Sequence, residues 1–220
     1  MKVSIIIPVY NEERTVEKVI NEIKKVPVEK EIIVVDDGSC DRTKEILRNI
    51  DNIKKIFFDK NQGKGSAIRA GLKLATGDIV IIQDADLEYN PFDYLNLIKP
   101  FRKYGTNIVV YGSRFKGSGK FLFLSRLANI ILNFFTNLLF GSKISDMETC
   151  YKVLPRKIML SLNLKSKRFE IEPEITAKLL KKKIRIVEVP ISYQARKVGK
   201  KIKPKDGIIA LLTLLYYRIA

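Results

Sequence analysis

Three carboxylates at alternate positions follow a short apolar run near the middle of the chain. Residues 79–82 read IVII, and Asp84, Asp86 and Glu88 come shortly after them. A short apolar run bounded by polar residues is typical of a buried parallel strand, and open α/β sheets bind ligands at the carboxyl ends of such strands. Carboxylates this close repel one another unless a cation lies between them. The pattern predicts a site where Mg²⁺ or Mn²⁺ chelates a diphosphate, and a solvated acidic loop is the alternative.

Two earlier strands are predicted to end in turns that carry polar residues. The first covers residues 2–8, and Asn11 is placed to cap the helix that follows it. The second covers residues 31–35 and ends just before an acidic turn that contains Asp37. A carboxylate at such a strand end can accept hydrogen bonds from a ribose hydroxyl or a base N–H. The alternative is an ordinary capping turn, because Asp and Gly favour turns.

A glycine-containing segment, residues 61–67 (NQGKGSA), leads into a helix predicted over residues 67–75. Glycines at the start of a helix leave backbone N–H groups that suit an anion, and Lys64 lies among them. The spacing of Lys and Ser differs from that of a P-loop. Taken alone, this segment is a weak signal for phosphate binding.

The order of the elements predicts an α/β fold with a mostly parallel, Rossmann-like sheet flanked by helices. Strand and helix patterns alternate from residue 2 to residue 111, which favours a sheet covered on both faces. At 220 residues the chain is most simply one domain. Further strands are expected at 53–58, 107–111 and 184–189. Helices are expected at 91–101, 121–140, 156–162, 170–182 and 207–217, the last of them capped by Asp206. A polar loop is expected at 145–152 and a basic loop at 196–205.

The composition limits the kinds of catalytic and metal-binding sites that the chain can form. The chain has 41 Lys and Arg against 24 Asp and Glu, a formal net charge of +17, and no histidine. The absence of His excludes a Ser-His-Asp site, a Cys-His site and His-ligated zinc, so any metal must be held by oxygen. The positive charge suits nucleic acid, an anionic membrane surface or phosphorylated substrates, although a solvated lysine-rich surface would give the same charge. Cys40 and Cys150 form neither a metal motif nor a disulfide framework.

Residues 121–140 carry much apolar surface, dotted with Asn and a single Arg, and Lys116 and Lys143 lie on either side. This pattern is typical of an amphipathic helix in a membrane interface, and a long core helix is the alternative. The helix at 207–217 is expected to be a second interfacial element. No run of ~18 uninterrupted apolar residues is present, and Lys2 leads directly into the first strand, so we expect neither a confident membrane span nor a signal peptide.

Four motifs together resemble family-2 glycosyltransferases of the GT-A fold, and the likeness runs over nearly the whole chain. They are IIIPVYNEE near Ile5, VVDDGSCDRT near Val34, NQGKGSAIRAG near Asn61 and QDADLEYNP near Gln83. Later segments resemble the polyprenyl-phosphate branch, that of the dolichyl-phosphate mannose synthases. They are YGSRF at Tyr111, LSRLAN at Leu124, SDMETCYKVLPR at Ser145, EVPISY at Glu188 and RKVGKK at Arg196.

This resemblance implies roles for particular side chains. The nucleoside pocket would be lined by Pro8, Tyr10, Glu12 and Asp37, with Lys64 as a further donor contact. The metal would be surrounded by Asp84, Asp86 and Glu88. The acceptor phosphate would be held by Arg114 and Arg126, and the donor would be closed over by Arg196 and Lys200. Residues 1–115 would then form the nucleotide-sugar and metal half, and residues 116–220 the acceptor half with its membrane-interface helices.

The implied reaction moves a hexose, mannose in the most familiar members, from a nucleotide diphosphate to a dolichyl or polyprenyl phosphate with inversion. GDP-mannose is the expected donor, with UDP-glucose or another UDP-sugar as its competitor. Glu88 departs from the Gln often found at this position in the mannose synthases, which leaves the metal geometry and the donor open. We expect the protein to lack the transmembrane domain that many relatives append. We therefore expect a peripheral enzyme on the cytoplasmic face of the membrane, or one that relies on a separate membrane-anchoring subunit.

The acceptor decides whether a general base is needed. A phosphate monoester has a second pKa near ~6 and is substantially ionised at neutral pH, so it needs cations rather than a base. A sugar hydroxyl would need a carboxylate base, with Asp146 as the leading candidate and Glu148 behind it. Under the lipid-phosphate hypothesis, Asp146 would only orient the acceptor or a basic residue.

The sequence is also compatible with two other classes of function. The net charge of +17 could indicate a nucleic-acid-binding protein. However, the basic residues are scattered and no aromatic-basic single-strand motif is present, so we expect no nucleic-acid partner. A catalytically inactive scaffold that only binds nucleotide sugar is the third hypothesis, and the intact set of carboxylates argues mildly against it.

Overall fold

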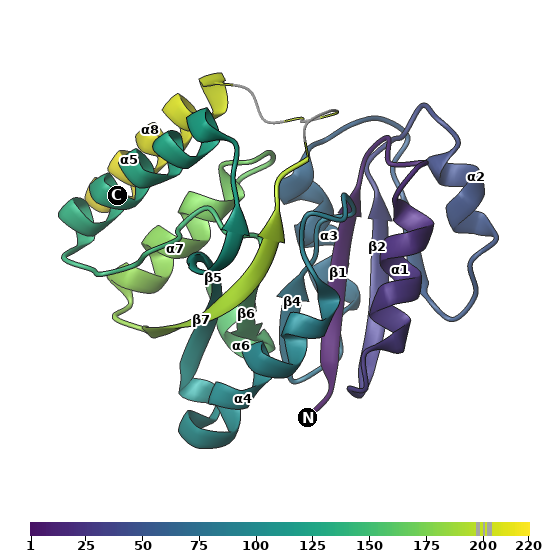
Figure 1. Cartoon of the computed structure of the whole chain (residues 1–220), viewed down its shortest axis with the longest axis horizontal. Coiled ribbons are helices and arrows are strands. Elements are labelled where there is room, and N and C mark those ends of the chain that lie inside the picture. The colour runs from purple at the N-terminus through teal and green to yellow at the C-terminus, as the bar shows by residue number, and fades with distance from the viewer. Residues whose placement is uncertain (197–198, 200, 202–203) are drawn as a thin grey trace.

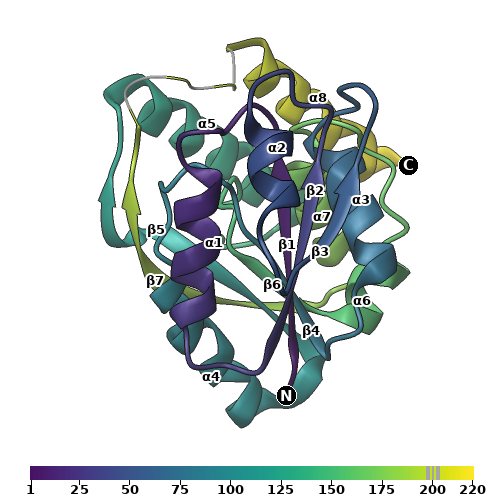
Figure 2. The same ribbon diagram turned by 90° about the vertical axis from the view of Figure 1, so that its right-hand side faces the viewer.

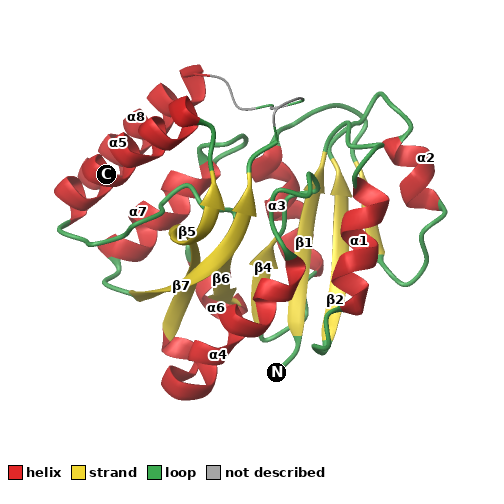
Figure 3. Cartoon of the chain, in the orientation of Figure 1, coloured by secondary structure: helices red, strands yellow, loops and turns green. Residues whose placement is uncertain are grey.

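Seven strands form one sheet in the computed structural model, which describes residues 1–196, 199, 201 and 204–220 (Figure 3). The strands are β1 (Val3–Val9), β2 (Lys30–Asp36), β3 (Lys54–Phe57), β4 (Ile79–Ile82), β5 (Ile108–Lys120), β6 (Lys152–Pro155) and β7 (Arg185–Gln194). Their order across the sheet is β3-β2-β1-β4-β6-β5-β7. β6 is antiparallel to both neighbours, and the other adjacent pairs are parallel. The predicted α/β fold with a mostly parallel sheet is confirmed.

Helices cover both faces of this sheet. They are α1 (Val16–Lys25), α2 (Thr43–Arg48), α3 (Lys64–Leu74), α4 (Tyr94–Tyr104), α5 (Phe123–Phe140), α6 (Arg156–Ser161), α7 (Ile171–Lys181) and α8 (Pro204–Ile219). α1 and α4 lie on one face, and α3, α6 and α7 lie on the other (Figure 2). α5 and α8 lie side by side and both contact α7 (Figure 1).

The central strands are apolar on both faces. Ile5, Ile6 and Ile7 in β1 are fully buried, as are all four residues of β4. Strands that are buried on both faces read as continuous apolar runs, and this is why β4 was predictable from four residues. α1 covers β1 through an apolar stripe at helical spacing, formed by Val16, Val19, Ile20 and Ile23.

The helix after β1 begins later than its sequence predicts. Asn11 does not cap it, because α1 begins at Val16 and Thr15 occupies the cap position. Asn11 adopts a positive φ of 50°, and its side-chain oxygen accepts a hydrogen bond from the Cys40 N–H at 2.8 Å. The prediction that Asn11 caps the helix was therefore wrong. Asn tolerates the left-handed conformation and occurs in turns as readily as at helix caps. Asn11 instead ties the loop after β1 to the loop after β2.

The sequence pattern misses one strand and misplaces several element ends. Lys152, read as the end of a polar loop, begins β6, whose four residues are too few to show a period. β5 continues to Lys120 and pairs with β7 along this extension. α3 begins at Lys64, and Asp206 lies inside the first turn of α8 rather than at its cap.

α5 and α8 expose much of their apolar surface. The exposed side chains include Phe123, Leu124, Phe134 and Leu138 on α5, and Ile208, Leu212, Tyr216 and Ile219 on α8. Only 17% of α5 is buried, so the alternative of a core helix does not describe it. In the described part of the chain, α5 is the one helix that is long and apolar enough to cross a membrane by length and composition.

Candidate active site

Polar residues from several strands meet at the carboxyl edge of the sheet, which is the upper edge in Figure 1. Asp84 follows β4, and its Oδ1 lies 2.8 Å from the Lys64 ammonium at the start of α3. The same ammonium lies 3.1 Å from Glu172 on α7. Burial alone would lower the pKa of Lys64, but Asp84 and Glu172 raise it well above its ordinary value. Lys64 therefore stays charged and lowers the pKa of Asp84 against the effect of burial.

Asp84, Asp86 and Glu88 form the acidic set of this site. Asp86 is the member whose negative charge is least compensated. Burial, reinforced by the nearby Asp84 and Glu88 carboxylates, raises its pKa to about 7. Among the described residues its closest cation is Arg196, whose Nη2 lies 3.7 Å from the Asp86 Oδ2. An ionised carboxylate in this position is under-compensated, so additional positive charge near Asp86 would be stabilising.

Arg196, at the end of β7, joins the first and fourth strand ends. Its Nη1 donates to both oxygens of Glu12, at 2.9 and 3.2 Å, while its Nη2 faces Asp86. Its backbone N–H donates to the Glu88 Oε1 at 2.7 Å. Glu12 and Arg196 are 184 positions apart in the chain, so the fold creates this contact.

Glu88 is held mainly by groups from the end of β7. Besides the Arg196 N–H, the Tyr193 hydroxyl donates to its Oε2 at 2.8 Å. Both oxygens of Glu88 therefore have partners within the protein. Tyr193 is a site residue that sequence reasoning missed, because nothing in the pattern separates it from an ordinary strand tyrosine.

Asp37 shapes the loop before α3. Its carboxylate accepts hydrogen bonds from the backbone N–H groups of Gln62 and Gly63, at 2.7 and 2.8 Å, and from the Asn61 side chain at 2.9 Å. Gly63 has a φ of 97°, a conformation that favours glycine. The Gln62 and Gly63 N–H groups thus bind Asp37 rather than facing outward to a phosphate. The neighbouring Asp36 is buried, and its Oδ1 has no hydrogen-bond partner among the described residues.

The predicted nucleoside residues lie along the same edge. Pro8 is half-buried in β1, opposite Val35 of β2. The Lys201 ammonium contacts the Tyr10 carbonyl, lies 5.6 Å from the centre of the Tyr10 ring and pairs with Glu12 at 2.7 Å. Lys200, predicted to close over the donor, lies outside the described residues. Lys201 was not singled out from the basic segment, in which it is one of several cations.

Arg114 and Asp146 form a buried bidentate pair. Arg114 Nε and Nη2 donate to the two Asp146 oxygens at 2.8 and 2.7 Å, and the Arg114 backbone N–H donates to Oδ2 at 2.8 Å. Arg114 also lies over the Phe121 and Tyr193 rings, 5.3 and 5.0 Å from their centres. Asp146 is fully buried, so the geometry favours its orienting role over that of a base.

Arg126 lies on α5, three residues before Asn129, whose Oδ1 accepts a hydrogen bond from the Arg114 Nη2 at 3.0 Å. It is on the exposed side of α5, and the described residues include no ion-pair partner for it. Its neighbours Leu124 and Leu127 are exposed as well. Arg126 is therefore exposed on the helix that Arg114 contacts through Asn129, and its role at the acceptor phosphate stays a prediction.

Lys152 and Glu172 form a second buried ion pair, which is linked to Asp84 through Lys64. The Lys152 Nζ lies 2.6 Å from the Glu172 Oε2 and also donates to the Met147 and Thr149 carbonyls, at 2.8 and 2.6 Å. All three protons of the ammonium are thereby used. Sequence reasoning singled out neither Lys152 nor Glu172.

The residues present fit a hard divalent cation bound mainly by substrate. The described residues contain no ready group of three Asp, Glu, Cys or His ligands, because Asp84 pairs with Lys64 and Glu88 is tied to β7. Mg²⁺ is commonly held by one or two carboxylates together with phosphate oxygens and water. Asp86, buried beside two like charges, is the carboxylate that such an ion would compensate best.

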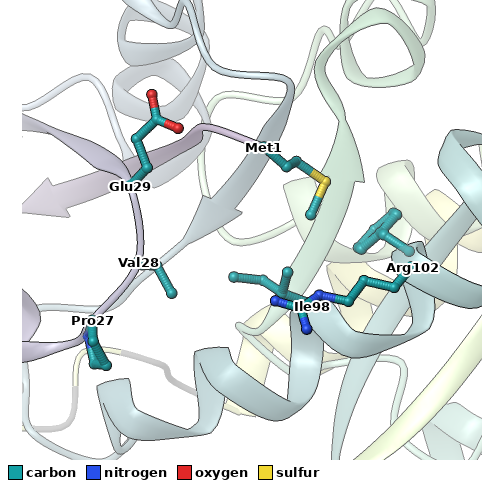
Figure 4. Close-up of a pocket in the computed structure, with 7 residues that line it drawn as sticks. Met1, Pro27, Val28, Glu29, Ile98 and Arg102 are labelled. Carbon is teal, nitrogen blue, oxygen red and sulfur yellow. The ribbon is translucent and has the colours of Figure 1, made fainter.

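A hollow of about 480 Å³ lies at the other edge of the sheet (Figure 4). Its lining includes Met1 and Val28, which precede β1 and β2, together with Ile98 and Phe101 on α4. It is thus at the amino ends of the strands, separate from the acidic set. This hollow is not the candidate active site.

A mostly parallel sheet with paired acids and cations at its carboxyl edge belongs to the class of open α/β folds that bind ligands at this edge. The chain belongs to glycosyl transferase family 2, whose family model matches residues 4–161. It is similar to the UDP-N-acetylglucosamine–dolichyl-phosphate N-acetylglucosaminyltransferase of Methanococcus voltae, at 32% identity over 85% of this chain and 83% of that protein. It is also similar to the undecaprenyl-phosphate 4-deoxy-4-formamido-L-arabinose transferase of Photorhabdus laumondii, at 30% identity over 98% of this chain and 66% of that protein.

Solved structures share the fold at low sequence identity. Glucosyl-3-phosphoglycerate synthase from Mycobacterium tuberculosis, in complex with Mn²⁺, UDP and phosphoglyceric acid, matches with a TM-score of 0.77 and 21% identity over 99% of this chain and 78% of its own. The same enzyme in complex with Mg²⁺ and UDP matches with a TM-score of 0.75 and 22% identity, over 98% of this chain and 79% of its own. At these identities the likeness shows the fold alone.

Proposed function

We propose that the protein is a metal-dependent, inverting glycosyltransferase that moves a hexose from a nucleotide diphosphate sugar to a polyprenyl or dolichyl phosphate. The observation that carries this proposal is the contact of Arg196 with both Glu12 and Asp86. It joins two strand ends that are far apart in sequence into one acidic and basic cluster. The relatives that act on dolichyl and undecaprenyl phosphates support the class of acceptor.

The donor diphosphate would lie between Asp86 and the cations that follow β7, Arg196 and Lys201. A divalent ion bound at Asp86, with Asp84 and Glu88 nearby, would neutralise charge on the leaving diphosphate. Lys64 fixes the orientation of Asp84 through their 2.8 Å contact. Arg196 and Lys201 pair with Glu12 in this structure, and a diphosphate offers the same cations a stronger, charge-assisted partner.

The acceptor needs positive charge rather than a base. A phosphate monoester is already substantially ionised at neutral pH, since its second pKa is ~6. Asp146 holds the Arg114 guanidinium through two hydrogen bonds and fixes its position over the ring of Tyr193. Arg126 is placed to meet a lipid phosphate at the surface of α5. The alternative of a hydroxyl acceptor is less favoured, because the leading base candidate, Asp146, is fully engaged.

A UDP-sugar is the better-supported donor. One curated relative uses UDP-N-acetylglucosamine by name, and the solved relatives were crystallised with UDP. GDP-mannose, expected from the first resemblance, has no such support among these relatives and becomes the competing donor. N-acetylglucosamine is the hexose derivative to test first.

The exposed apolar faces of α5 and α8 would rest on an anionic membrane at its cytoplasmic side. α5 carries the exposed Arg126, and the exposed Lys120 and Lys143 lie just beyond its two ends. Apolar side chains that enter the interface, flanked by basic residues at the headgroups, give peripheral binding. The polyprenyl acceptor is itself a membrane lipid, so this face would bring the site to its substrate.

One pair of experiments tests the proposal. Thermal unfolding is measured with UDP-sugars and GDP-mannose in the presence of Mn²⁺ or Mg²⁺, and transfer to a short polyprenyl phosphate is then assayed with the donor that stabilises most. We expect metal-dependent stabilisation and sugar transfer. The proposal fails if no nucleotide sugar stabilises the protein with either metal, or if a bound donor is transferred to sugar hydroxyls but not to the lipid phosphate.

A further inference from the structure

Glu148 is a carboxylate in the site region that the mechanism above does not use. It lies in the segment between α5 and β6, and its Oε1 is buried without a hydrogen-bond partner among the described residues. Buried polar atoms are nearly always paired, so an orphan oxygen requires an explanation. The side chain as a whole is half-buried, so Glu148 is accessible in part.

The segment around Glu148 is pinned on several sides. Asp146 is bound to Arg114, and the Met147 and Thr149 carbonyls accept hydrogen bonds from Lys152. The Thr149 hydroxyl also donates to a backbone carbonyl of β5 at 2.6 Å. Glu148 is thus the member of this run with a buried side-chain oxygen, Oε1, that has no partner among the described residues, while its neighbours are fixed. Its position is preorganised, which is what a ligand-contacting residue requires.

Glu148 lies in the run between Asp146, which binds Arg114 on the acceptor side, and Cys150, whose thiol donates to the Ile82 carbonyl at the end of β4 on the donor side. The charged groups that act on it are Lys152 from β6, Glu172 from α7, Arg114 from β5 and Lys64 from α3. Lys64 contacts Asp84 on the donor side, and Arg114 belongs to the acceptor side. The transferred sugar must lie between the donor diphosphate and the acceptor phosphate, so Glu148 is near the place of the sugar.

The chemistry of this position excludes other ligands. A metal ion is disfavoured because three cations, Lys152, Arg114 and Lys64, already act to lower the pKa of Glu148. A phosphate is disfavoured because it would face a carboxylate. A general base is not needed for an acceptor that is already ionised. What remains is a neutral hydrogen-bond donor, the hydroxyl or amide N–H of a sugar ring substituent.

We propose that Glu148 is a specificity-determining residue whose carboxylate accepts a hydrogen bond from a hydroxyl or acetamido N–H of the transferred sugar. This inference rests on the proposed function. Burial, partly offset by Lys152, raises the pKa of Glu148 to about 7, as expected for a carboxylate that lacks a donor until its ligand binds. A site that hydrogen-bonds a sugar group discriminates strongly against an analogue that lacks it.

The test compares nucleotide with nucleotide sugar. Binding of UDP, UDP-glucose, UDP-N-acetylglucosamine and GDP-mannose is measured by calorimetry with Mn²⁺ for the wild type, Glu148→Met and Glu148→Gln. Met keeps the volume and removes the acceptor oxygens, whereas Gln keeps one. We expect UDP to bind all three proteins within about twofold. The preferred nucleotide sugar should bind Glu148→Met roughly 10- to 100-fold more weakly than the wild type, with Glu148→Gln between them.

Deoxy donors identify the contact. The preferred donor is replaced by analogues that lack one hydroxyl each, or by the sugar without its acetamido group. In the wild type, one of these deletions should weaken binding by about the same factor as Glu148→Met, and in Glu148→Met the same deletion should cost nothing further.

Glu188→Gln is the matched control, since Glu188 holds the same segment through the Ser145 N–H and hydroxyl, both at 2.8 Å. The deoxy penalty should persist in this variant. The inference is overturned if Glu148→Met weakens UDP and UDP-sugar equally, or if every deoxy penalty is unchanged in Glu148→Met. If the wild type binds no nucleotide with metal, the proposed function itself fails.

Discussion

The Lys152 ammonium lies 2.6 Å from the Glu172 carboxylate, and both side chains are buried. The other Glu172 oxygen lies 3.1 Å from Lys64, which in turn lies 2.8 Å from Asp84. A chain of alternating charges therefore runs from the core strand β6 to the acidic set at the end of β4. It connects the fixed segment before β6 with the predicted metal site.

The first prediction concerns the free energy of unfolding. Lys152→Met should lower it by about 3–5 kcal/mol, because Glu172 loses a buried partner and two carbonyls lose their donor. The double variant Lys152→Met/Glu172→Met should be less destabilised than the sum of the single variants, as measured by urea denaturation. Lys25→Met is the control. Its pair with Glu22 has a similar distance of 2.8 Å but is exposed, and should contribute less than about 1 kcal/mol. Equal losses from Lys152→Met and Lys25→Met would contradict a special role for the buried pair.

The ends of β1, β2 and β4, which carry the site, were predictable from the sequence, whereas the partners of their side chains were not. The apolar run Ile79–Ile82 and the acids after it indicate both the strand and the site, because local pattern determines both. Lys152 is one of 41 Lys and Arg residues, and its partner Glu172 is 20 positions away, so no local signal distinguishes it from a surface lysine. Arg114 and Arg126 look alike in sequence, yet one is buried against Asp146 and the other is exposed on α5. The difference in burial between these two arginines comes from tertiary packing, which cannot be read from their spacing in the sequence.

The second prediction concerns Asp86. The folded-state pKa of Asp86 is raised to about 7, so this carboxyl lowers the stability of the fold as pH rises from about 4 through 7. At pH 8 without metal, Asp86→Asn should therefore be at least as stable as the wild type. With Mn²⁺ and UDP, only the wild type should gain stability, and transfer should be lost in the variant. Retained metal-dependent stabilisation or transfer in Asp86→Asn would remove the metal assignment.

The third prediction separates two roles of Asp146. Asp146→Asn leaves the Arg114 guanidinium buried without its anion, so the unfolding free energy should fall by about 3–5 kcal/mol. Turnover per folded molecule should fall only moderately, because Arg114 keeps its charge and its ring contacts. Activity is measured at a temperature well below the unfolding midpoint of the variant. An unchanged stability together with a loss of turnover by several orders of magnitude would instead identify Asp146 as a base, and the acceptor as a hydroxyl.

The fourth prediction is a pH dependence caused by Glu148. Burial raises its pKa from 4.5 to about 7, against the opposing effects of Lys152, Arg114 and Lys64 and with the support of Glu172. The folded state thus binds this proton more tightly than the unfolded state, and the contribution of Glu148 to stability is lost as pH rises through 7. Relative to Glu148→Gln, the wild type should lose on the order of 1 kcal/mol or more between pH 5 and pH 8. Parallel stability curves for the two proteins would show that Glu148 keeps an ordinary pKa.

The last prediction concerns the apolar face of α5 and α8. The protein should pellet with vesicles that contain anionic lipid at low salt and be released at high salt, because screening weakens the attraction between basic residues and headgroups. Leu124 and Phe134 are 76% and 61% exposed, so replacing both with Glu should abolish pelleting without unfolding the protein. Leu74→Glu on α3, at 40% exposure, is the control and should pellet like the wild type. Circular dichroism establishes that all three proteins are folded.

Pelleting that persists in the Leu124→Glu/Phe134→Glu variant, or is equally reduced in Leu74→Glu, would show that charge alone holds the protein to the vesicle. Failure of the wild type to pellet at any salt concentration would remove the membrane from the proposal and leave this face to another partner.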